Sequence, residues 1–327
     1  MKRKIKRRKN KQIKILIIGS LSILLFLCVG YAAFSTNLSL TAKGNIKELR
    51  GAEYLRKVCN QTSGDGLYKD IYEEGRCVYK GANPNNYINF NNELWRIISV
   101  EIDGTIKIIR NEIIGYMAFD TQGLRPIGYC TQGIALEHGC NAWAAMDYFS
   151  NDNYSGKVSR DAELNIYLNN TYLYTLSDYD KVVSGNYYIG SVLYNNSDLL
   201  SQIENEKKYK WNGKVGLINV SEYIRANSNQ ENCGNFNLNN INSNTCLTNN
   251  WMYQIVPSNQ YLWTISPNSK TADGMHDIHY DGKIGGQSGS TVSNEEGYGV
   301  SPVVYLNKNI ILSNSGTLED PYKIKKV

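Results

Sequence analysis

An uncharged apolar stretch at residues 15–34 constrains this chain most, because nine Lys or Arg residues and no acidic residue precede it within residues 1–14. At about 1.5 Å per residue, such a helix spans about 30 Å, the thickness of a hydrocarbon core. Cationic flanks stay on the cytoplasmic side. We therefore expect a cytoplasmic tail at 1–14, a single helix across the lipid bilayer at 15–34, and an extracellular remainder. The alternative is a signal peptide cleaved at Ala33-Phe34-Ser35, which gives a secreted protein.

Charge and composition exclude several classes of protein. The chain has 327 residues and a formal net charge of +5, but nine of its 35 basic residues belong to the tail. The other 26 basic residues are outnumbered by 30 acidic residues. A nucleic-acid binder needs its basic surplus on the folded surface, so we expect no such partner. A hydrophobic content of 42% with 20% charged residues also excludes a disordered chain and a polytopic membrane protein.

The cysteines indicate an oxidising compartment. Cys28 lies within the apolar stretch, where it acts as a small hydrophobe. The other six form three couples that are close in sequence: Cys59 and Cys77, Cys130 and Cys140, and Cys233 and Cys246. Exported domains form disulfides, so pairing within each couple is the simplest expectation, while other connectivities and a fully reduced set stay open. Spacing of the C-x2-C kind is absent, which argues against a cysteine-bound metal.

Strand patterns occur at both ends of the exported part. Residues 94–100 and 105–110 are β-rich and flank Asp103-Gly104, which predicts a hairpin with a type I′ turn. A sheet that is wet on one side would expose the cations of these strands, which are Arg96, Lys107 and Arg110. Later strands are expected at residues 215–220, 261–266, 276–284, 300–306 and 310–312.

Helical spacing occurs in three places. Residues 51–60 predict a short amphipathic helix with Tyr54, Leu55 and Val58 on its inner face. A longer helix is expected after an N-cap at Ser159, and another begins at Ser221. The longer helix should bury Leu164, Tyr167, Leu168, Tyr172 and Leu176. This arrangement indicates an α+β fold, with a stalk and short helix at 35–77 and one domain at 78–327.

Seven short strings of the chain resemble a known family. They are residues 78–87 (VYKGANPNNY), 92–97 (NELWRI), 215–218 (VGLI), 221–223 (SEY), 263–267 (WTISP), 299–304 (GVSPVV) and 316–322 (GTLEDPY). Their order is similar to that in uncharacterised membrane-anchored, exported proteins of low-GC Gram-positive and cell-wall-less bacteria. The resemblance implies a C-terminal C-type-lectin-like domain of the formylglycine-generating type, with antiparallel sheets and two or more helices. It implies no activity, because the function of that family is unknown and a fold does not specify function.

No constellation for catalysis or metal binding is evident. Trp211-Asn212-Gly213 lacks the carboxylate that calcium-dependent lectins place in such a string, and formylglycine generation needs reactive cysteines rather than paired ones. His276 and His279 would point to opposite faces of a strand, which disfavours chelation of one metal by both. Residues 285–290 (GGQSGS) lack the G-x-S-x-G spacing of a serine nucleophile. We expect no catalytic residue, no metal and no cofactor.

Tyrosine and asparagine are abundant, with 25 Tyr and 40 Asn. Both suit adaptable binding surfaces, although AT-rich codons explain the same abundance, and we expect Trp263 in the core. The candidate ligand-binding residues are Asn268, His276, His279, Tyr280 and Tyr298. The leading hypothesis is a non-catalytic cell-surface protein that binds an extracellular glycan or protein. The alternatives are a pilin-like structural component that associates through residues 37–50, and a secreted hydrolase acting on the envelope.

Overall fold

The two β-rich runs form the antiparallel strands β4 (Glu93–Val100) and β5 (Ile106–Arg110) in the middle of the largest sheet, so the predicted hairpin is confirmed. A type I′ turn needs positive φ at two central residues. Gly104 has a φ of +90°, whereas Asp103 has no positive φ, so the predicted turn type is wrong. Gly104 N donates to the Glu101 carbonyl oxygen at 2.9 Å, and this single left-handed glycine closes the turn.

The computed structural model describes residues 50–121, 140–150, 155–192, 198–234, 244–270, 273–285 and 298–325. The expected tail and membrane helix at 1–34, including Cys28, lie outside the described residues. Within the described ranges, no helix is both long enough and apolar enough to cross a membrane. One compact unit extends over Leu49–Val327, and it includes the described part of the 35–77 segment.

Among the described residues, the largest sheet has ten strands, and its main path runs β11-β15-β5-β4-β3-β17-β16. In addition, β2 pairs with β4, β1 with β2, and β8 with β15. All pairs are antiparallel except β17 and β3. The remaining strands of this sheet are β1 (Gly66–Lys69), β2 (Cys77–Lys80), β3 (Tyr87–Phe90), β8 (Val182–Val183), β11 (Val215–Gly216), β15 (Val303–Leu306), β16 (Leu312–Ser313) and β17 (Tyr322–Ile324).

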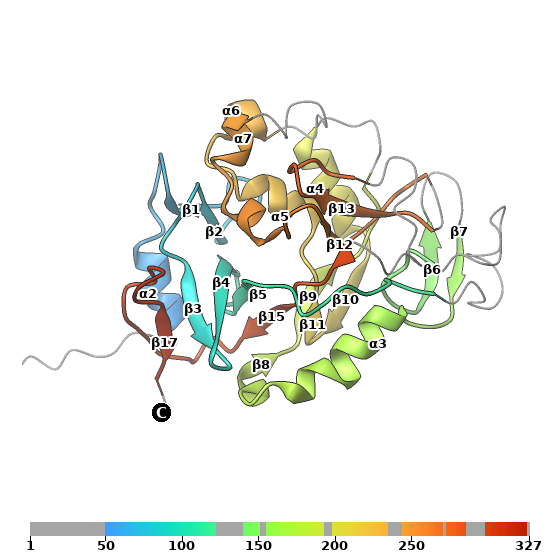
Figure 1. Cartoon of the computed structure of the whole chain (residues 1–327), viewed down its shortest axis with the longest axis horizontal. Helices are drawn as coiled ribbons and strands as arrows, with labels where there is room; N and C mark the ends of the chain where they lie inside the picture. The colour runs from blue at the N-terminus through green and yellow to red at the C-terminus, as the bar shows by residue number, and fades with distance from the viewer. Residues whose placement is uncertain are drawn as a thin grey trace, which may run out of the picture. The chain divides into compact units, whose positions relative to one another are not determined.

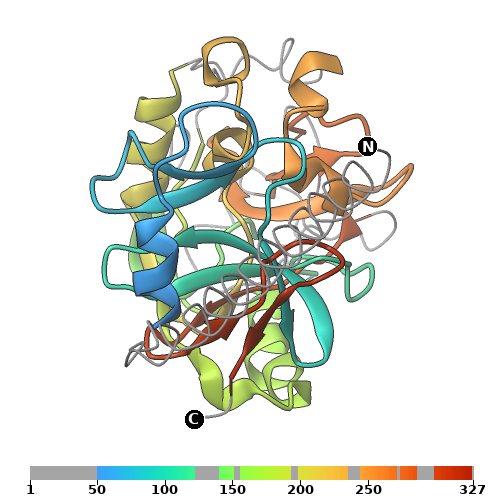
Figure 2. The ribbon, with the colours of Figure 1, turned by 90° about the vertical axis from the view of Figure 1, so that its left-hand side faces the viewer.

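The described helices are short, and the longest has nine residues. The α-helices are α2 (Gly51–Lys57), α3 (Glu163–Asn170), α4 (Leu199–Lys207), α5 (Val220–Arg225), α6 (Gln230–Cys233) and α7 (Asn244–Leu247). Turns of 3-10 helix occur at Tyr172–Thr175, Tyr179–Lys181 and Trp251–Ile255. Short helices and mainly antiparallel strands in one body confirm the α+β class. Figure 2 shows α2 lying across the strands of the large sheet.

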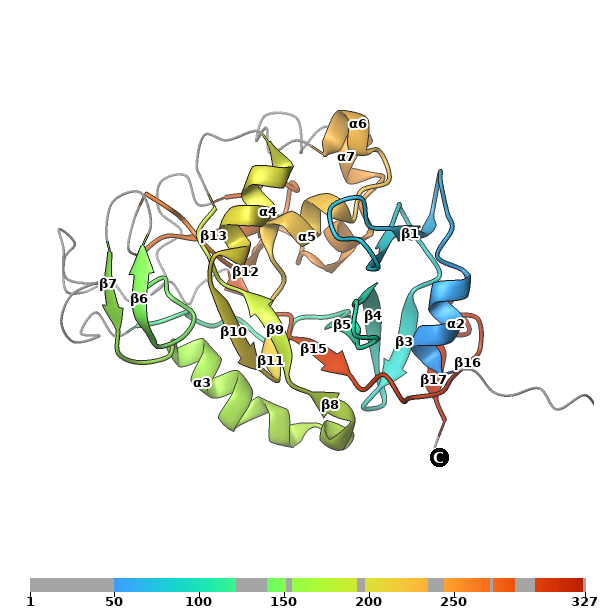
Figure 3. The same cartoon turned by 180° about the vertical axis from the view of Figure 1, so that it is seen from behind.

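Three smaller sheets complete the described strands. One has the order β13-β12-β14, and the other two are the antiparallel pairs β9–β10 and β6–β7. Their strands are β6 (Met146–Ser150), β7 (Ser155–Val158), β9 (Gly185–Tyr188), β10 (Lys210–Gly213), β12 (Tyr261–Pro267), β13 (Met275–His279) and β14 (Tyr298–Gly299). Figure 3 shows the β9–β10 pair between α3 and α4, together with β11, the end strand of the large sheet.

The helix predictions are right in type but inexact in detail. α2 buries Leu55, whereas Tyr54 and Val58 of its expected inner face are exposed. α3 begins after Ala162 rather than Ser159, and Tyr167 is 37% exposed, unlike the other four expected residues. The strand expected at 215–220 is confined to β11, because Asn219 caps α5 through a capping box with Glu222.

One hydrophobic core contains the fully buried side chains of Trp95, Trp143, Trp251 and Trp263, which confirms the expectation for Trp263. The expected wet face of β4 and β5 is wrong, because Arg96 is 0% and Lys107 2% exposed. Arg96 instead stacks between two rings, at 4.1 Å from the centroid of Tyr87 and 4.6 Å from that of Trp251. Consecutive residues of both strands are buried, so both faces of this hairpin are covered, in part by Trp251 from a much later segment.

Two of the three expected disulfides are confirmed. Cys59–Cys77 joins the residues after α2 to β2, and Cys233–Cys246 joins α6 to α7. Cys140 is also disulfide-bonded, and its expected partner Cys130 lies outside the described residues.

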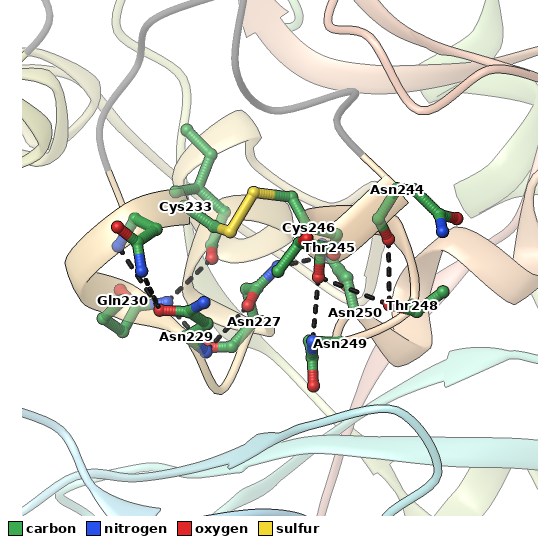
Figure 4. The surroundings of a disulfide bond; sticks show 12 residues. Asn227, Asn229, Gln230, Cys233, Asn244, Thr245, Cys246, Thr248, Asn249 and Asn250 are labelled. Carbon is green, nitrogen blue, oxygen red and sulfur yellow. Dashed lines mark hydrogen bonds between the residues drawn. A yellow bond between two sulfur atoms is a disulfide. The ribbon is translucent and has the colours of Figure 1, made fainter.

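Asparagine side chains support the second disulfide (Figure 4). Asn227 Nδ2 donates to the Cys246 carbonyl oxygen at 2.7 Å, and Asn249 Nδ2 donates to that of Thr245 at 2.8 Å. Asn250 Nδ2 donates to a more distant backbone carbonyl, that of Tyr223, at 2.8 Å. Part of the asparagine surplus therefore satisfies backbone groups rather than forming a binding surface.

Candidate functional site

The five residues proposed from the sequence do not form one exposed face. Asn268, His276 and Tyr298 are buried, with 1%, 1% and 6% of their surface exposed. His279 is half-buried and Tyr280 is 47% exposed, so only these two are open to a ligand.

Tyr261 brings three of the five together. Its ring centroid lies 4.6 Å from that of His279 and 6.3 Å from that of Tyr280, and it stacks on Tyr298 at 5.1 Å. Asn268 follows the opposite end of β12 and is not part of this group.

The two histidines lie on opposite sides of β13, as expected. His276 is buried and its Nδ1 lies 2.7 Å from the Gly285 carbonyl oxygen, whereas His279 Nε2 lies 3.2 Å from Asp277 Oδ1. Burial lowers the pKa of His276, and the hydrogen bond with Asp277 raises the pKa of His279. Within the described part of the chain, no group of three or more His, Cys, Asp or Glu residues is placed to hold a metal ion.

A cavity of about 300 Å³ with charged walls is a stronger candidate site. Its lining residues come from the β1–β2 turn, the β4–β5 hairpin and α5, and from β9, β10 and β15. Its buried or half-buried charged residues are Glu73, Arg76, Glu101, Lys107, Glu222 and Arg225. We call it the charge-lined cavity. Concave sites with convergent polar groups and shifted pKa values are the usual places for ligands.

Arg76 is the centre of an ion-pair network in the lining of this cavity. Its side chain is 3% exposed, and Nη1 lies 2.9 Å from Asp70 Oδ2. Nε lies 3.0 Å from Glu101 Oε1, and Nη2 lies 3.2 Å from Glu222 Oε1. Nη2 also donates to Ser99 Oγ at 3.0 Å. Burial opposes the positive charge, but the surrounding carboxylates raise the pKa of Arg76 well above its ordinary value.

Two further cations of the cavity lining join the network. Lys107 Nζ lies 2.6 Å from Glu222 Oε1, and Arg225 Nη1 lies 2.8 Å from Asp70 Oδ2 and 3.0 Å from Glu73 Oε1. Burial by itself would raise the pKa of each of these carboxyls, but the adjacent cations hold all three pKa values below their usual range. All three are therefore ionised at neutral pH.

The network leaves carboxylate lone pairs facing the cavity. Arg76 uses Nε, Nη1 and Nη2 on protein acceptors. A carboxylate has about four lone-pair positions. Glu101 accepts from Arg76 and Ser99, and its side chain is still 21% exposed. The turn residue Asp103 adds a further carboxylate to the lining.

The β9–β10 pair contributes uncharged polar groups and an aromatic ring to the lining. Asn212 Nδ2 donates to Asn186 Oδ1 at 3.2 Å across the β9–β10 pair, and both residues are exposed. Tyr188 lies beside them, with Lys207 Nζ at 5.4 Å and Lys210 Nζ at 5.7 Å from its ring centroid. The amide pair retains donors and an acceptor for a ligand.

Sequence reasoning missed this site. Arg76 and Glu222 meet although 146 positions separate them, and Lys107 and Glu222 are 115 positions apart. The available signal was the cation Lys107 within an apolar β-run, which we assigned to solvent instead of to a buried partner.

A general acid needs a raised carboxyl pKa, and among the described carboxyls with a shifted pKa one is shifted upward. Burial raises the pKa of Glu206, but this residue does not line the charge-lined cavity. Ser221 Oγ and Ser266 Oγ both donate to its carboxylate within the core. The carboxyls facing the cavity with shifted pKa values are shifted downward, so they are poor proton donors.

The comparisons with known proteins give no assignment. No protein-family model, no curated protein and no solved structure matches this chain.

Proposed function

We propose that this chain is a non-catalytic bacterial cell-surface protein that binds an extracellular ligand bearing a primary ammonium group in the charge-lined cavity. The stretch at 15–34 anchors it in the lipid bilayer, with the N-terminus cytoplasmic and the domain outside. Cleavage of that stretch makes the same protein secreted. The domain at 78–327 is C-type-lectin-like in this proposal, which its short helices and mainly antiparallel sheets support.

The observation behind the ligand class is the surplus of acceptors in the cavity. Four carboxylates but three cations line it. The cations donate to protein carboxylates, and Arg225 also donates to the Ser221 carbonyl oxygen. An ammonium group has three donors and no acceptor, so it complements Glu101 and Asp103. The amide pair of Asn186 and Asn212 can bond polar groups next to that ammonium.

Two observations support export. Disulfides persist in oxidising compartments, and Cys59–Cys77 and Cys233–Cys246 are paired in the domain. The basic tail before the apolar stretch at 15–34 favours an outward-facing domain. Intact mass of the protein from its native membrane tests both points. A full-length chain that gains a hydrogen on each paired sulfur on reduction supports the anchored form, and a chain beginning near residue 36 supports the secreted one.

Calorimetry of the full chain in mild detergent tests the ligand class. The probe is Nα-acetyl-lysine amide, and the comparison is the same compound acetylated at Nε, which lacks the charge. We expect Glu101→Gln to weaken binding of the probe by about tenfold or more, because a charge-assisted hydrogen bond is lost. Asp147→Asn is the matched control, since that side chain is 98% exposed and outside the cavity. Equal binding of the two compounds would contradict the proposal.

A further inference from the structure

A second pocket lies between α2 and the C-terminal strands. Its volume is about 340 Å³, and it shares no lining residue with the charge-lined cavity. Three tyrosines contribute to its walls: Tyr54 of α2, Tyr79 of β2 and Tyr322 of β17. Figure 1 shows α2 next to β17 on one side of the large sheet. We call this site the tyrosine pocket.

The tyrosines supply an exposed ring above a neutral polar floor. Tyr54 is 37% exposed, and its ring meets that of Tyr322 edge-on at 6.4 Å. Tyr79 and Tyr322 are both buried, each with 4% of its surface exposed. Burial raises the pKa of both Tyr79 and Tyr322, so these hydroxyls are uncharged at physiological pH.

Amide side chains surround the opening. Asn83 Oδ1 accepts from the Tyr87 hydroxyl at 3.0 Å, and Gln61 Nε2 donates to the Ser63 carbonyl oxygen at 2.6 Å. The Asn83 Nδ2 and Gln61 Oε1 groups have no partner among the described residues, and Asn85 is exposed at the rim. The rim therefore offers both donors and acceptors in an exposed position.

Two glycines allow this pocket to be preformed. Gly81 has a φ of +113°, and a Cβ there would lie 2.2 Å from Asp65 Oδ1. That carboxylate accepts from two backbone N–H groups, at 2.7 and 3.0 Å. Gly316 has a φ of +78°, and a Cβ there would lie 2.3 Å from Tyr322 Cε2. A side chain at either position would displace a wall of the pocket.

The electrostatics select an uncharged ligand. No lysine or arginine lies among the described lining residues, so a bound anion would have no cationic partner. Asp65, the one carboxylate among these described residues, already accepts the two backbone N–H groups. The volume falls in the range of small-molecule sites. Tyrosine rings suit the apolar face of a ligand, and amides suit its hydroxyl groups.

We propose that the tyrosine pocket is a second binding site and that it takes a neutral pyranose sugar. The C–H face of the sugar ring lies against Tyr54, while Asn83, Asn85 and Gln61 hydrogen-bond its hydroxyls. This site is independent of the ammonium site in the charge-lined cavity, so either proposal can fail without the other.

Saturation-transfer NMR of the full chain tests this proposal. The probes are the methyl β-glycosides of glucose, galactose and N-acetylglucosamine. We expect at least one to bind, with about tenfold weaker binding to Tyr54→Ala and weaker binding to Asn85→Ala. Tyr174→Ala is the matched control, because Tyr174 is 66% exposed and outside the pocket.

Glu101→Gln separates the two proposals, because it should leave glycoside binding unchanged. Absence of transfer to all three glycosides would overturn the sugar site, as would equal binding by wild type and Tyr54→Ala. Loss of glycoside binding in Glu101→Gln would place the sugar in the charge-lined cavity and would also overturn it.

Discussion

Replacement of Arg76 by methionine tests whether the ion-pair network stabilises the cavity wall. Arg76 is buried and contacts Asp70, Glu101 and Glu222 within 3.2 Å. Methionine is similar in length but uncharged. The variant therefore leaves these three carboxylates and Glu73 with three remaining cations nearby.

The expected loss of stability depends on which carboxylate loses its cationic partner. Removing one partner of a buried ion pair costs about 3–5 kcal/mol. Asp70 and Glu222 keep other cations, so the uncompensated charge falls on Glu101. Its side chain is 21% exposed and partly hydrated. We therefore expect a loss near the lower bound, about 3 kcal/mol in the free energy of unfolding.

The pH dependence gives a second check. The pKa values of Asp70, Glu73 and Glu222 are lower in the folded protein than their usual values. Their contribution to stability is therefore complete above the unfolded values of about 4, and it is lost as pH falls through the folded values. The effect of Arg76→Met should be largest at neutral pH and smaller below about pH 4.

Urea unfolding of the full chain at neutral pH and below about pH 4 measures the stability lost in Arg76→Met. Lys157→Met is the control, because its pair with Asp147 has side chains 63% and 98% exposed and should contribute about 0–1 kcal/mol. The reasoning is refuted if Arg76→Met loses no more stability than Lys157→Met, or if its loss is the same at both pH values.

Three further changes have defined outcomes. Histidine ring-proton titration by NMR should give a pKa above 6.5 for His279 and below 6.5 for His276. Because the folded pKa of His279 is raised, His279 adds stability below the unfolded pKa of about 6.5, and this stability is lost as pH rises through its folded pKa. Because the folded pKa of His276 is lowered, His276 reduces stability below the unfolded pKa. Arg96→Lys should cost about 1–2 kcal/mol in urea unfolding, because lysine cannot keep both stacking contacts. Loss of the Cys59–Cys77 disulfide in a double serine variant should cost about 3 kcal/mol, and an unchanged unfolding midpoint would contradict this.

Local patterns in the sequence were sufficient for features that depend on neighbours along the chain. The β4–β5 hairpin follows from two β-rich runs around one glycine, and two disulfides join cysteines only 18 and 13 positions apart. α4 was missed although its signal was present. Asp198 accepts from Leu200 N and Ser201 N as an N-cap, and apolar residues follow at helical spacing.

The environment of the buried cations could not be predicted from local patterns in the sequence. Arg96 and Lys107 were assigned to a wet face because charged residues usually remain hydrated. Their actual partners include Gln254, 158 positions from Arg96, and Glu222, 115 positions from Lys107. Only the tertiary structure brings these groups within hydrogen-bond distance.

The difference between local patterns and long-range contacts also applies to the charge-lined cavity and the tyrosine pocket. The sequence by itself determined the α+β class, the nearby cysteine couples and the abundance of tyrosine and asparagine. The tertiary structure decided which of these residues face a cavity, and it buried three of the five proposed binding residues. The physical reason is that secondary structure and short loops depend on local interactions, whereas a binding site depends on desolvation and on charge pairs between distant segments.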